Sequence, residues 1–454
     1  MSGAARGAGF GWAGIVRLGL VQTALGAIII LMTSTLNRVM VVELGLVAAI
    51  PGLLVGLHYA VQMSRPRWGY GADTGGKRTP WILGGMTVLA AGAILAAASA
   101  ALMTASLVPG LILAMAAFTL IGAGAGAAGT NLLALLAIRT EPSRKAAAAA
   151  IVWIMMIFGF VLTAGIGGQL LKPFTFERLI LVTAGVSLIA VTLAALALYR
   201  LEGAASAAPA QAAPKPEPGA FKAAILEIWG ETQARRFTVF VFVSMLAYSA
   251  QDLIMEPFAG IVYGYSVGAS TQLAGVQNMG TLAGMLVTAL VCTLIGKSRA
   301  GFMRAWTVGG CIASATALIT LAAGTRAFGS DWALVPNVLA LGAANGAFAV
   351  AAIGSMMTLA SSGRASREGT RMGLWGASQA IAFGLGGLLG AVAADAARFA
   401  LADPTTAFAL VFAAEGALFL IAAGLALHVG RSEADDRRLP VLPAGEFAAA
   451  ERRE

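Results

Sequence analysis

Apolar stretches long enough to span a membrane recur along almost the whole chain, and this repetition constrains the fold more than any other feature. A helix of about 18 or more apolar residues crosses a hydrocarbon core roughly 30 Å thick, and we count about twelve such stretches. Only 11 % of the residues are charged, whereas a soluble domain typically carries about 25 %. The sequence therefore predicts an all-α membrane protein with twelve transmembrane helices.

The expected spans form two groups of six around a polar segment. We expect them at residues 15–35, 46–62, 81–103, 113–137, 148–171 and 179–198, and then at 237–255, 273–295, 303–323, 333–359, 372–394 and 407–427. Four prolines within residues 201–236 prevent a continuous helix there. We therefore expect an N-terminal six-helix half over residues 1–200, a cytoplasmic linker over 201–236, a C-terminal six-helix half over 237–429 and a cytoplasmic tail over 430–454.

Basic residues are concentrated in alternate loops and at the two ends of the chain. The loops on the opposite side contain only Arg38, Lys172, Arg178, Arg326 and Arg398. Because cytoplasmic loops of membrane proteins carry the excess of Lys and Arg, both termini are expected in the cytoplasm. The same distribution accounts for the net charge of +9 without nucleic acid as a partner. We expect no cleaved signal peptide, since the first apolar stretch continues into a spanning helix.

A short basic loop at residues 65–80 joins the second and third expected spans. Its pattern of Gly69, Asp73, Gly76, Lys77 and Arg78 resembles the signature loop of the major facilitator superfamily of transporters. Glycines allow a sharp turn, and the aspartate is suited to bind exposed backbone N–H groups or the arginine. We expect a gating loop that locks the cytoplasmic ends of the two halves. The alternative is a basic turn that only sets topology.

The corresponding loop of the second half, at residues 296–304, has no aspartate. A gate that relied on both loops would therefore be asymmetric.

A glycine-rich stretch from Gly122 to Gly129 in the fourth span predicts a close helix crossing, because small residues let backbones approach in lipid. Cys292 and Cys311 lack the spacing of metal ligands, so we expect two small buried residues.

Ionisable residues inside apolar spans each cost several kcal/mol unless they are paired or face a cavity. In the seventh span, Tyr248, Asp252 and Glu256 are four residues apart and share one face. Pro257 is expected to end that helix directly afterwards. One interpretation is a cavity that holds a proton, a metal-centred ligand or a polar head group. The other is that Glu256 lies at the far membrane surface and Asp252 binds a neighbour.

Two further residues are costly by position. His58 lies within the second span, where an imidazole can bind a metal, including the magnesium of a chlorin, or hydrogen-bond within the bundle. Glu415 lies near the middle of the last span, whereas His428 lies at its end. The remaining polar residues are expected to join helices by hydrogen bonds: Asn131, Gln277, Asn278, Asn345 and Gln379.

Four stretches resemble a particular branch of the superfamily, the PucC/LhaA or bacteriochlorophyll delivery family. They are residues 14–26, 34–44, 57–80 and 251–260. The resemblance implies an inner-membrane factor for the assembly of light-harvesting complexes in photosynthetic bacteria, with bacteriochlorophyll as cargo and not as catalytic cofactor. It also implies antenna polypeptides as recipients, with bacteriochlorophyll synthase and the membrane insertion machinery as further expected partners. It carries over no ligand residue.

Two other functions remain open at this point. The signature loop and the carboxylates of the seventh span equally suit a proton-coupled transporter of a small amphiphilic molecule. A pigment-synthesising enzyme is the third possibility, but prenyltransferases need paired aspartate-rich motifs, and Asp395 and Asp403, expected in a non-cytoplasmic loop, form none. There is also no phosphate-binding loop. We therefore expect a protein that is not an enzyme.

Overall fold

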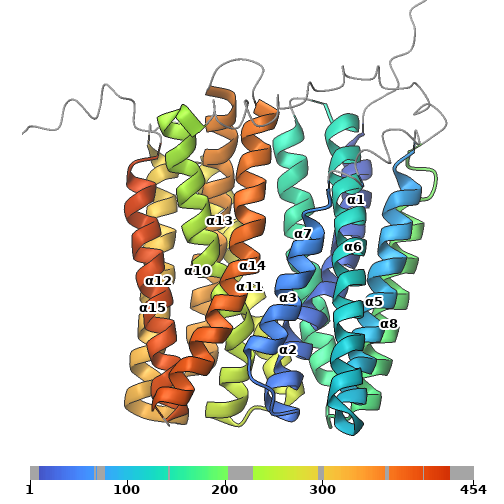
Figure 1. The fold of residues 1–454 in the computed structure, drawn as a ribbon. Coiled ribbons are helices and arrows are strands. Elements are labelled where there is room, and N and C mark those ends of the chain that lie inside the picture. Colours follow the sequence, from blue (N-terminus) through green and yellow to red (C-terminus); the bar gives the residue numbers. More distant parts are fainter. Residues whose placement is uncertain are drawn as a thin grey trace, which may run out of the picture.

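The computed structural model describes residues 10–65, 68, 77–141, 144–202, 229–294, 301–362, 368–401 and 403–429. Every regular element within these ranges is a helix. Figure 1 shows the long helices side by side and roughly aligned, with those coloured blue to green in one half of the molecule and those coloured yellow-green to red in the other. The arrangement is that of a helical bundle in two halves.

The first half begins with one long, nearly continuous helix. It consists of α1 (Trp12–Ile30), a π-helical turn η1 (Leu31–Thr35), a single α-helical turn α2 (Leu36–Arg38) and a second π-helical turn η2 (Val39–Glu43). The other helices of this half are α3 (Ala49–Gln62), α5 (Thr79–Ala105), α6 (Leu107–Arg139), α7 (Lys145–Leu170) and α8 (Phe176–Leu198). Their inward residues form one hydrophobic core, which includes Leu18, Met86 and Phe118.

The second half repeats six long helices. They are α10 (Thr232–Tyr263), α11 (Val267–Leu294), α12 (Phe302–Phe328), α13 (Leu334–Ser362), α14 (Glu368–Leu401) and α15 (Pro404–Leu427), with a short 3-10 turn η6 (Gly329–Asp331) before α13. A separate hydrophobic core fills this half, with Phe240, Phe258 and Phe412 among its largest buried side chains.

Eleven of the described helices are long and apolar enough to cross a membrane, and α3 is a shorter apolar helix at the position of the expected second span. The prediction of an all-α membrane protein with twelve spans is thereby confirmed. Most helices extend beyond the expected ends by a few residues. For example, α6 begins at Leu107, whereas we expected residue 113. Likewise α10 begins at Thr232, inside the segment expected to be linker.

The first span ends later than expected. We placed its end at residue 35, before Asn37 and Arg38, but the helix continues through both to Glu43. Both polar side chains are buried and bonded to the second half: Asn37 donates to the Leu253 carbonyl and Arg38 to the Tyr265 carbonyl. Because these partners satisfy part of the hydrogen-bonding capacity of both side chains, the helix does not need to stop at them.

Pro257 does not end α10, and that prediction was wrong. The helix continues to Tyr263 with the proline inside it. Proline has no N–H, so the carbonyl four residues earlier loses its helical partner. That carbonyl belongs to Leu253, and it accepts a 2.5 Å hydrogen bond from the Asn37 side chain of the first half. A donor from another helix thus replaces the missing bond, as proline-containing membrane helices require.

The most extensive contacts between the halves are made by two pairs of helices: α7 packs on α11, and α3 packs on α14. The first contact is close because glycines face each other there. A Cβ atom on Gly268 would lie 2.3 Å from the Gly168 carbonyl oxygen, which is closer than any side chain tolerates. Small residues therefore set the distance between the halves at this crossing.

Candidate functional site

The stripe expected on the seventh span exists and faces the interior. Tyr248 and Asp252 of α10 are half-buried, and Glu256 is only 2 % exposed. Neither Glu256 oxygen is in hydrogen-bonding geometry with a donor among the described residues. Glu256 is therefore enclosed by protein, close to the end of α10.

An aromatic cluster continues this stripe across the bundle and joins the two halves. The ring of Tyr248 lies 5.8 Å from that of Phe383 and 6.3 Å from that of Phe348. Phe383 in turn lies 5.8 Å from Tyr59 of α3, in the first half. On the other side, Phe348 lies 5.7 Å from Phe419 of α15. These separations are typical of interacting aromatic pairs. We call these five residues the aromatic cluster.

Two carboxylates border the aromatic cluster. Asp252 is one helical turn from Tyr248, and it acts electrostatically on Tyr59, Tyr248 and Glu415. Glu415 is one turn from Phe419 and only 3 % exposed, and neither of its oxygens has a hydrogen-bond partner among the described residues. Carboxylates without partners inside a membrane bundle are costly and are retained where they serve a function. Aromatic faces beside unpartnered acids suit a flat amphiphilic ligand.

His58 is placed differently from the carboxylates. Its imidazole Nε2 lies 2.6 Å from the Gln62 side-chain nitrogen, and Arg65 donates to the oxygen of the same Gln62. The other ring nitrogen, Nδ1, is buried without a partner. The His58 backbone packs against Gly122 of α6, where a Cβ would lie 2.6 Å from the His58 carbonyl. The ring is therefore held within the first half, and only its neighbour Tyr59 belongs to the aromatic cluster.

Part of the expected gating loop lies outside the described residues, namely Gly69, Asp73 and Gly76. Lys77 and Arg78 are described, and Arg78 donates to the Asn131 side-chain oxygen of α6 at 3.3 Å. Asn131 in turn donates to the Trp68 carbonyl at 3.4 Å. Asn131 therefore anchors this loop to the fourth span.

Glu202 holds the end of the same loop, and the sequence analysis missed it. Its carboxylate accepts hydrogen bonds from the backbone N–H groups of Arg78 (2.8 Å) and Thr79 (2.9 Å) and from the Thr79 hydroxyl (2.7 Å). Burial alone would raise the pKa of Glu202, but the hydrogen bonds from Arg78 and Thr79 outweigh it and hold the pKa below its usual value. A carboxylate at the first N–H groups of α5 also complements the helix dipole.

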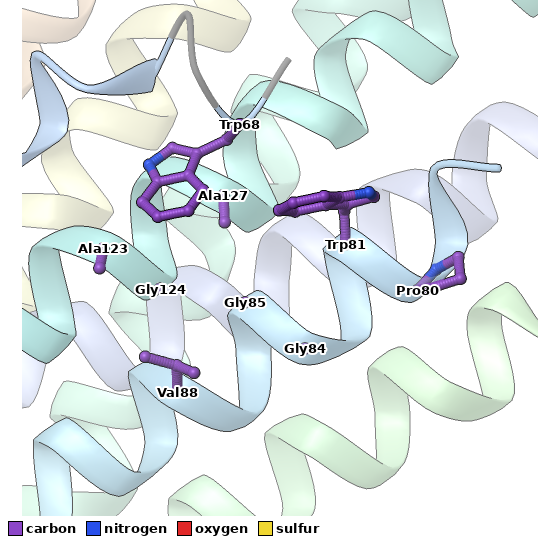
Figure 2. Close-up of a pocket in the computed structure, with 9 residues that line it drawn as sticks. All are labelled: Trp68, Pro80, Trp81, Gly84, Gly85, Val88, Ala123, Gly124 and Ala127. Carbon is purple, nitrogen blue, oxygen red and sulfur yellow. The ribbon is translucent and has the colours of Figure 1, made fainter. Parts of the chain in front are cut away.

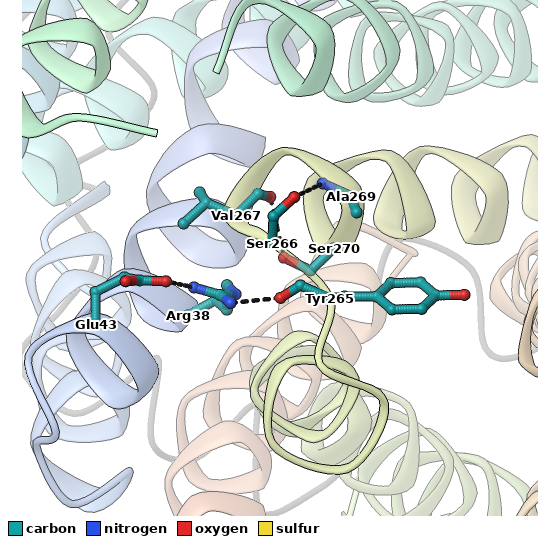
Figure 3. A network of polar contacts seen from close by, with 7 residues as sticks. All are labelled: Arg38, Glu43, Tyr265, Ser266, Val267, Ala269 and Ser270. Carbon is teal, nitrogen blue, oxygen red and sulfur yellow. Dashed lines mark hydrogen bonds and ion pairs between the residues drawn. The ribbon is translucent and has the colours of Figure 1, made fainter. Parts of the chain in front are cut away.

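At the opposite end of the bundle, Arg38 connects the halves (Figure 3). Its guanidinium pairs with Glu43 of its own helix and donates to the Tyr265 carbonyl of the second half at 2.6 Å. Nearby, the hydroxyls of Thr35 and Thr271 lie 2.9 Å apart. The sequence indicated Arg38 only as one of the few basic residues of the non-cytoplasmic side, beyond the expected end of the first span. We call this group of contacts the non-cytoplasmic latch, after the side on which the distribution of basic residues predicts this end of the bundle.

Asp395 adds a contact on the other side of the same end. We expected it in a loop, but it lies within α14, and its carboxylate accepts hydrogen bonds from the backbone N–H groups of Ala48 (3.0 Å) and Ala49 (2.7 Å) at the start of α3. Asp403 instead caps α15 by accepting from the N–H groups of Thr405 and Thr406. The structure therefore gives both aspartates roles in holding helices.

An apolar pocket of about 310 Å³ lies between α5 and α6 near the gating loop (Figure 2). Trp68 and Trp81 face it with ring centres 6.2 Å apart, and its floor consists of small residues. Gly124 makes the floor possible, since a Cβ there would lie 2.4 Å from the Leu89 nitrogen of α5. The close helix crossing expected from the glycine-rich stretch is present.

Solved structures with the same architecture are transporters. The nucleoside transporter NupG superimposes with a TM-score of 0.68 at 14 % identity, covering 92 % of this chain and 100 % of the other. The peptide transporter POT, in complex with sulfate, gives 0.68 at 16 % identity with 92 % and 95 % coverage. A bacterial homologue of the lysosomal transporter Spinster, inward-facing and unoccupied, gives 0.67 at 16 % identity with 94 % and 98 % coverage. The fold is that of major facilitator transporters.

Sequence comparison assigns the chain more narrowly. The family model described as PUCC protein matches residues 35–434, and the chain belongs to that family. The "Bacteriochlorophyll synthase 44.5 kDa chain" of Rhodobacter capsulatus is 50 % identical over 436 residues, which cover 96 % of this chain and 99 % of the relative. "Protein PucC" of the same organism is 28 % identical over 394 residues, with 84 % and 83 % coverage. The expected family is confirmed.

Proposed function

We propose that this protein is a membrane assembly factor that delivers bacteriochlorophyll to light-harvesting antenna polypeptides. The observation that carries the proposal is the aromatic cluster, which joins α3 of one half to α10, α13, α14 and α15 of the other and is bordered by Asp252 and Glu415. The name of the 50 % identical relative, a bacteriochlorophyll synthase chain, supports pigment as the cargo. Bacteriochlorophyll would be a passenger here and not a catalytic cofactor.

The chemistry of the cluster suits this cargo. A chlorin ring is flat and apolar with polar groups at its edge, and aromatic side chains stack against such rings. The phenol groups of Tyr59 and Tyr248 supply donors for edge carbonyl groups. His58 remains a candidate for the chlorin magnesium, but its Nε2 is engaged by Gln62. Variants of the α10 residues are therefore the sharper first test.

Handover would use the cytoplasmic end of the bundle. The gating loop, anchored by Asn131 and Glu202, would control access between the two six-helix halves, with both termini of the chain in the cytoplasm as the basic residues predict. The expected recipients are antenna polypeptides in a bacterial inner membrane, with bacteriochlorophyll synthase and the insertion machinery as neighbours. We propose no catalytic role for the residues of the aromatic cluster. In this proposal the protein carries pigment and is not an enzyme.

The test is pigment retention by the full chain purified in detergent from a pigment-making host. We expect bacteriochlorophyll in near-stoichiometric amount by absorption and extraction. Tyr248→Ala and Asp252→Asn should each lower the bound amount about tenfold or more, which corresponds to about 1.4 kcal/mol of binding energy. The exposed residues Tyr199 and Asp331 provide matched controls, because Tyr199→Ala and Asp331→Asn should retain the pigment. A colourless wild-type protein would contradict the proposal.

A proton-coupled transporter of a small amphiphile is the second candidate. It is favoured by the unpartnered carboxylates of Glu256 and Glu415 inside a transporter fold. Purified protein in liposomes with an imposed proton gradient would be tested with ethidium as an amphiphilic probe. Gradient-driven ethidium accumulation that Asp252→Asn abolishes would favour this function over pigment delivery.

A further inference from the structure

Arg38 and Glu256 each have an unused hydrogen-bonding group at the boundary between the halves. The Arg38 guanidinium uses one terminal nitrogen for Glu43 and the other for the Tyr265 carbonyl, while its Nε is buried without a partner. Both Glu256 oxygens are also buried without a partner in hydrogen-bonding geometry. The Ser270 hydroxyl is close to Glu256 but donates to the Val267 carbonyl at 3.0 Å.

The two groups are neighbours across the interface. Arg38 acts electrostatically on Glu256. Its guanidinium lies over α10 at Gly260, one helical turn after Glu256, where an added Cβ would come 3.1 Å from Nη2 and 3.3 Å from Nε. A side chain at Gly260 would therefore make the guanidinium shift by a few tenths of an ångström. A guanidinium can bind a second carboxylate through its remaining N–H.

Both groups also sit on helix segments that can change conformation. Arg38 ends a single α-helical turn that lies between two π-helical turns, and such turns often mark functional sites. Glu256 directly precedes Pro257, which interrupts the hydrogen bonding of α10. The ion-pair partner of Arg38 can therefore change with small movements of either helix.

We propose that Glu256 is a proton-binding site that controls the non-cytoplasmic latch. When Glu256 is ionised, it takes the free Nε–H of Arg38 and adds an ion pair between the halves. When Glu256 binds a proton, that pair is lost, Arg38 keeps only Glu43 as its acidic partner, and the non-cytoplasmic end is free to open. Low pH thus favours the open arrangement and high pH the closed one.

The protonation of Glu256 has to be considered together with the other charged groups near α10. On the elements packed against α10, they are Arg38 and Glu43 of the first helix, Asp331 of η6, Glu368, Arg371, Asp395 and Arg398 of α14 and Glu415 of α15, together with Arg235, Arg236 and Asp252 of α10 itself. Asp395 is satisfied by the α3 N–H groups, and Asp331 is exposed. Arg38 is the one among them that acts electrostatically on Glu256.

The test measures the opening of this end of the bundle in pigment-free, full-length protein. A negative result would therefore leave the proposed delivery of pigment unaffected. Spin labels at Ser106→Cys and Ala333→Cys, in a background with Cys292→Ser and Cys311→Ser, report the distance between the halves at this end. Both label sites are exposed. We expect a longer distance to gain population from about pH 8 to about pH 5, by up to about tenfold per pH unit for a single proton.

Variants identify the titrating group. Glu256→Gln should give the long distance at both pH values, whereas Glu43→Gln and the exposed control Asp331→Asn should keep the pH response. Gly260→Ala keeps the carboxylate but shifts the guanidinium by a few tenths of an ångström, so it should raise the population of the long distance at about pH 8. A wild-type distance that ignores pH would overturn the proposal, as would a pH response that survives in Glu256→Gln.

Discussion

Glu202 illustrates how much a single side chain beyond the end of a span can hold together. It accepts three hydrogen bonds at the start of α5, and its backbone carbonyl accepts a further bond from Arg139 at 3.1 Å. The same segment is held by Arg17, whose Nε donates to the Ala197 carbonyl at 2.8 Å. The ends of α1, α5, α6 and α8 are thereby joined at one point, directly beside the gating loop.

Removing this carboxylate should destabilise the first half. We expect Glu202→Ala to lower the free energy of unfolding by about 1–2 kcal/mol, because it removes a helix cap. Thermal unfolding in detergent would show it. Glu141→Ala is the matched control, since Glu141 is exposed and makes only a surface ion pair with Arg144 at 3.5 Å, which contributes little. Equal midpoints for the two variants would contradict this role.

The same residue predicts a pH dependence of stability. Because the pKa of Glu202 is held below its usual value in the folded protein, its contribution is complete above the usual carboxyl pKa of about 4.3. The contribution is lost as the pH falls through the lowered folded pKa. The difference in unfolding midpoint between wild type and Glu202→Ala should therefore shrink in acid. A difference in midpoint that grew as the pH fell would contradict this prediction.

Among the elements, α10 departs most from what its sequence predicts. A proline within a helix normally ends or kinks it, and the expectation fails here because Asn37, 216 residues away, supplies the missing hydrogen bond. The spans themselves were predictable, because length and apolarity are local properties. The Tyr248, Asp252 and Glu256 stripe followed from helical spacing alone. Phe348, Phe383 and Arg38 were missed, because their partners are distant in the sequence and join them only in the folded bundle.

A double-mutant cycle tests whether the Asn37 side chain replaces the backbone hydrogen bond that Pro257 removes from α10. Asn37→Ala leaves the Leu253 carbonyl without a donor and should cost about 1–3 kcal/mol of unfolding free energy. In a Pro257→Ala background the restored backbone N–H serves that carbonyl, so Asn37→Ala should cost clearly less. The measurement is the unfolding midpoint of the four proteins. Additive effects would show that Asn37 and Pro257 act independently.

For the molecule as a whole, the described polar contacts between the halves gather at one end, which the distribution of basic residues predicts to be non-cytoplasmic. The latch, Asp395 and the Gly168–Gly268 crossing all lie there, as does a hydrogen bond from Lys172 to Gln272 at 2.7 Å. In Figure 1 this is the end at which α2 is labelled. The structure thus represents a molecule closed at this end.

A substitution at the glycine crossing should disturb that closure. Gly268→Ala places a methyl group against the Gly168 backbone, so α7 and α11 must separate. We expect a loss of about 1–3 kcal/mol in stability, as for overpacking elsewhere. Gly185→Ala in α8 is the control, because nothing lies within 4 Å of its added Cβ. An unchanged unfolding midpoint for Gly268→Ala would show that α7 and α11 can separate at this crossing without loss of stability.

The bond from Asn37 to the Leu253 carbonyl also bears on biogenesis. The ribosome makes Asn37 long before α10, so the seventh span enters the membrane with a backbone acceptor that only an already inserted helix can satisfy. The second half therefore depends on the first half for a hydrogen bond to the Leu253 carbonyl. Expressed without residues 1–200, it would carry an unpaired carbonyl at membrane depth, and co-expression of the missing helices should rescue it.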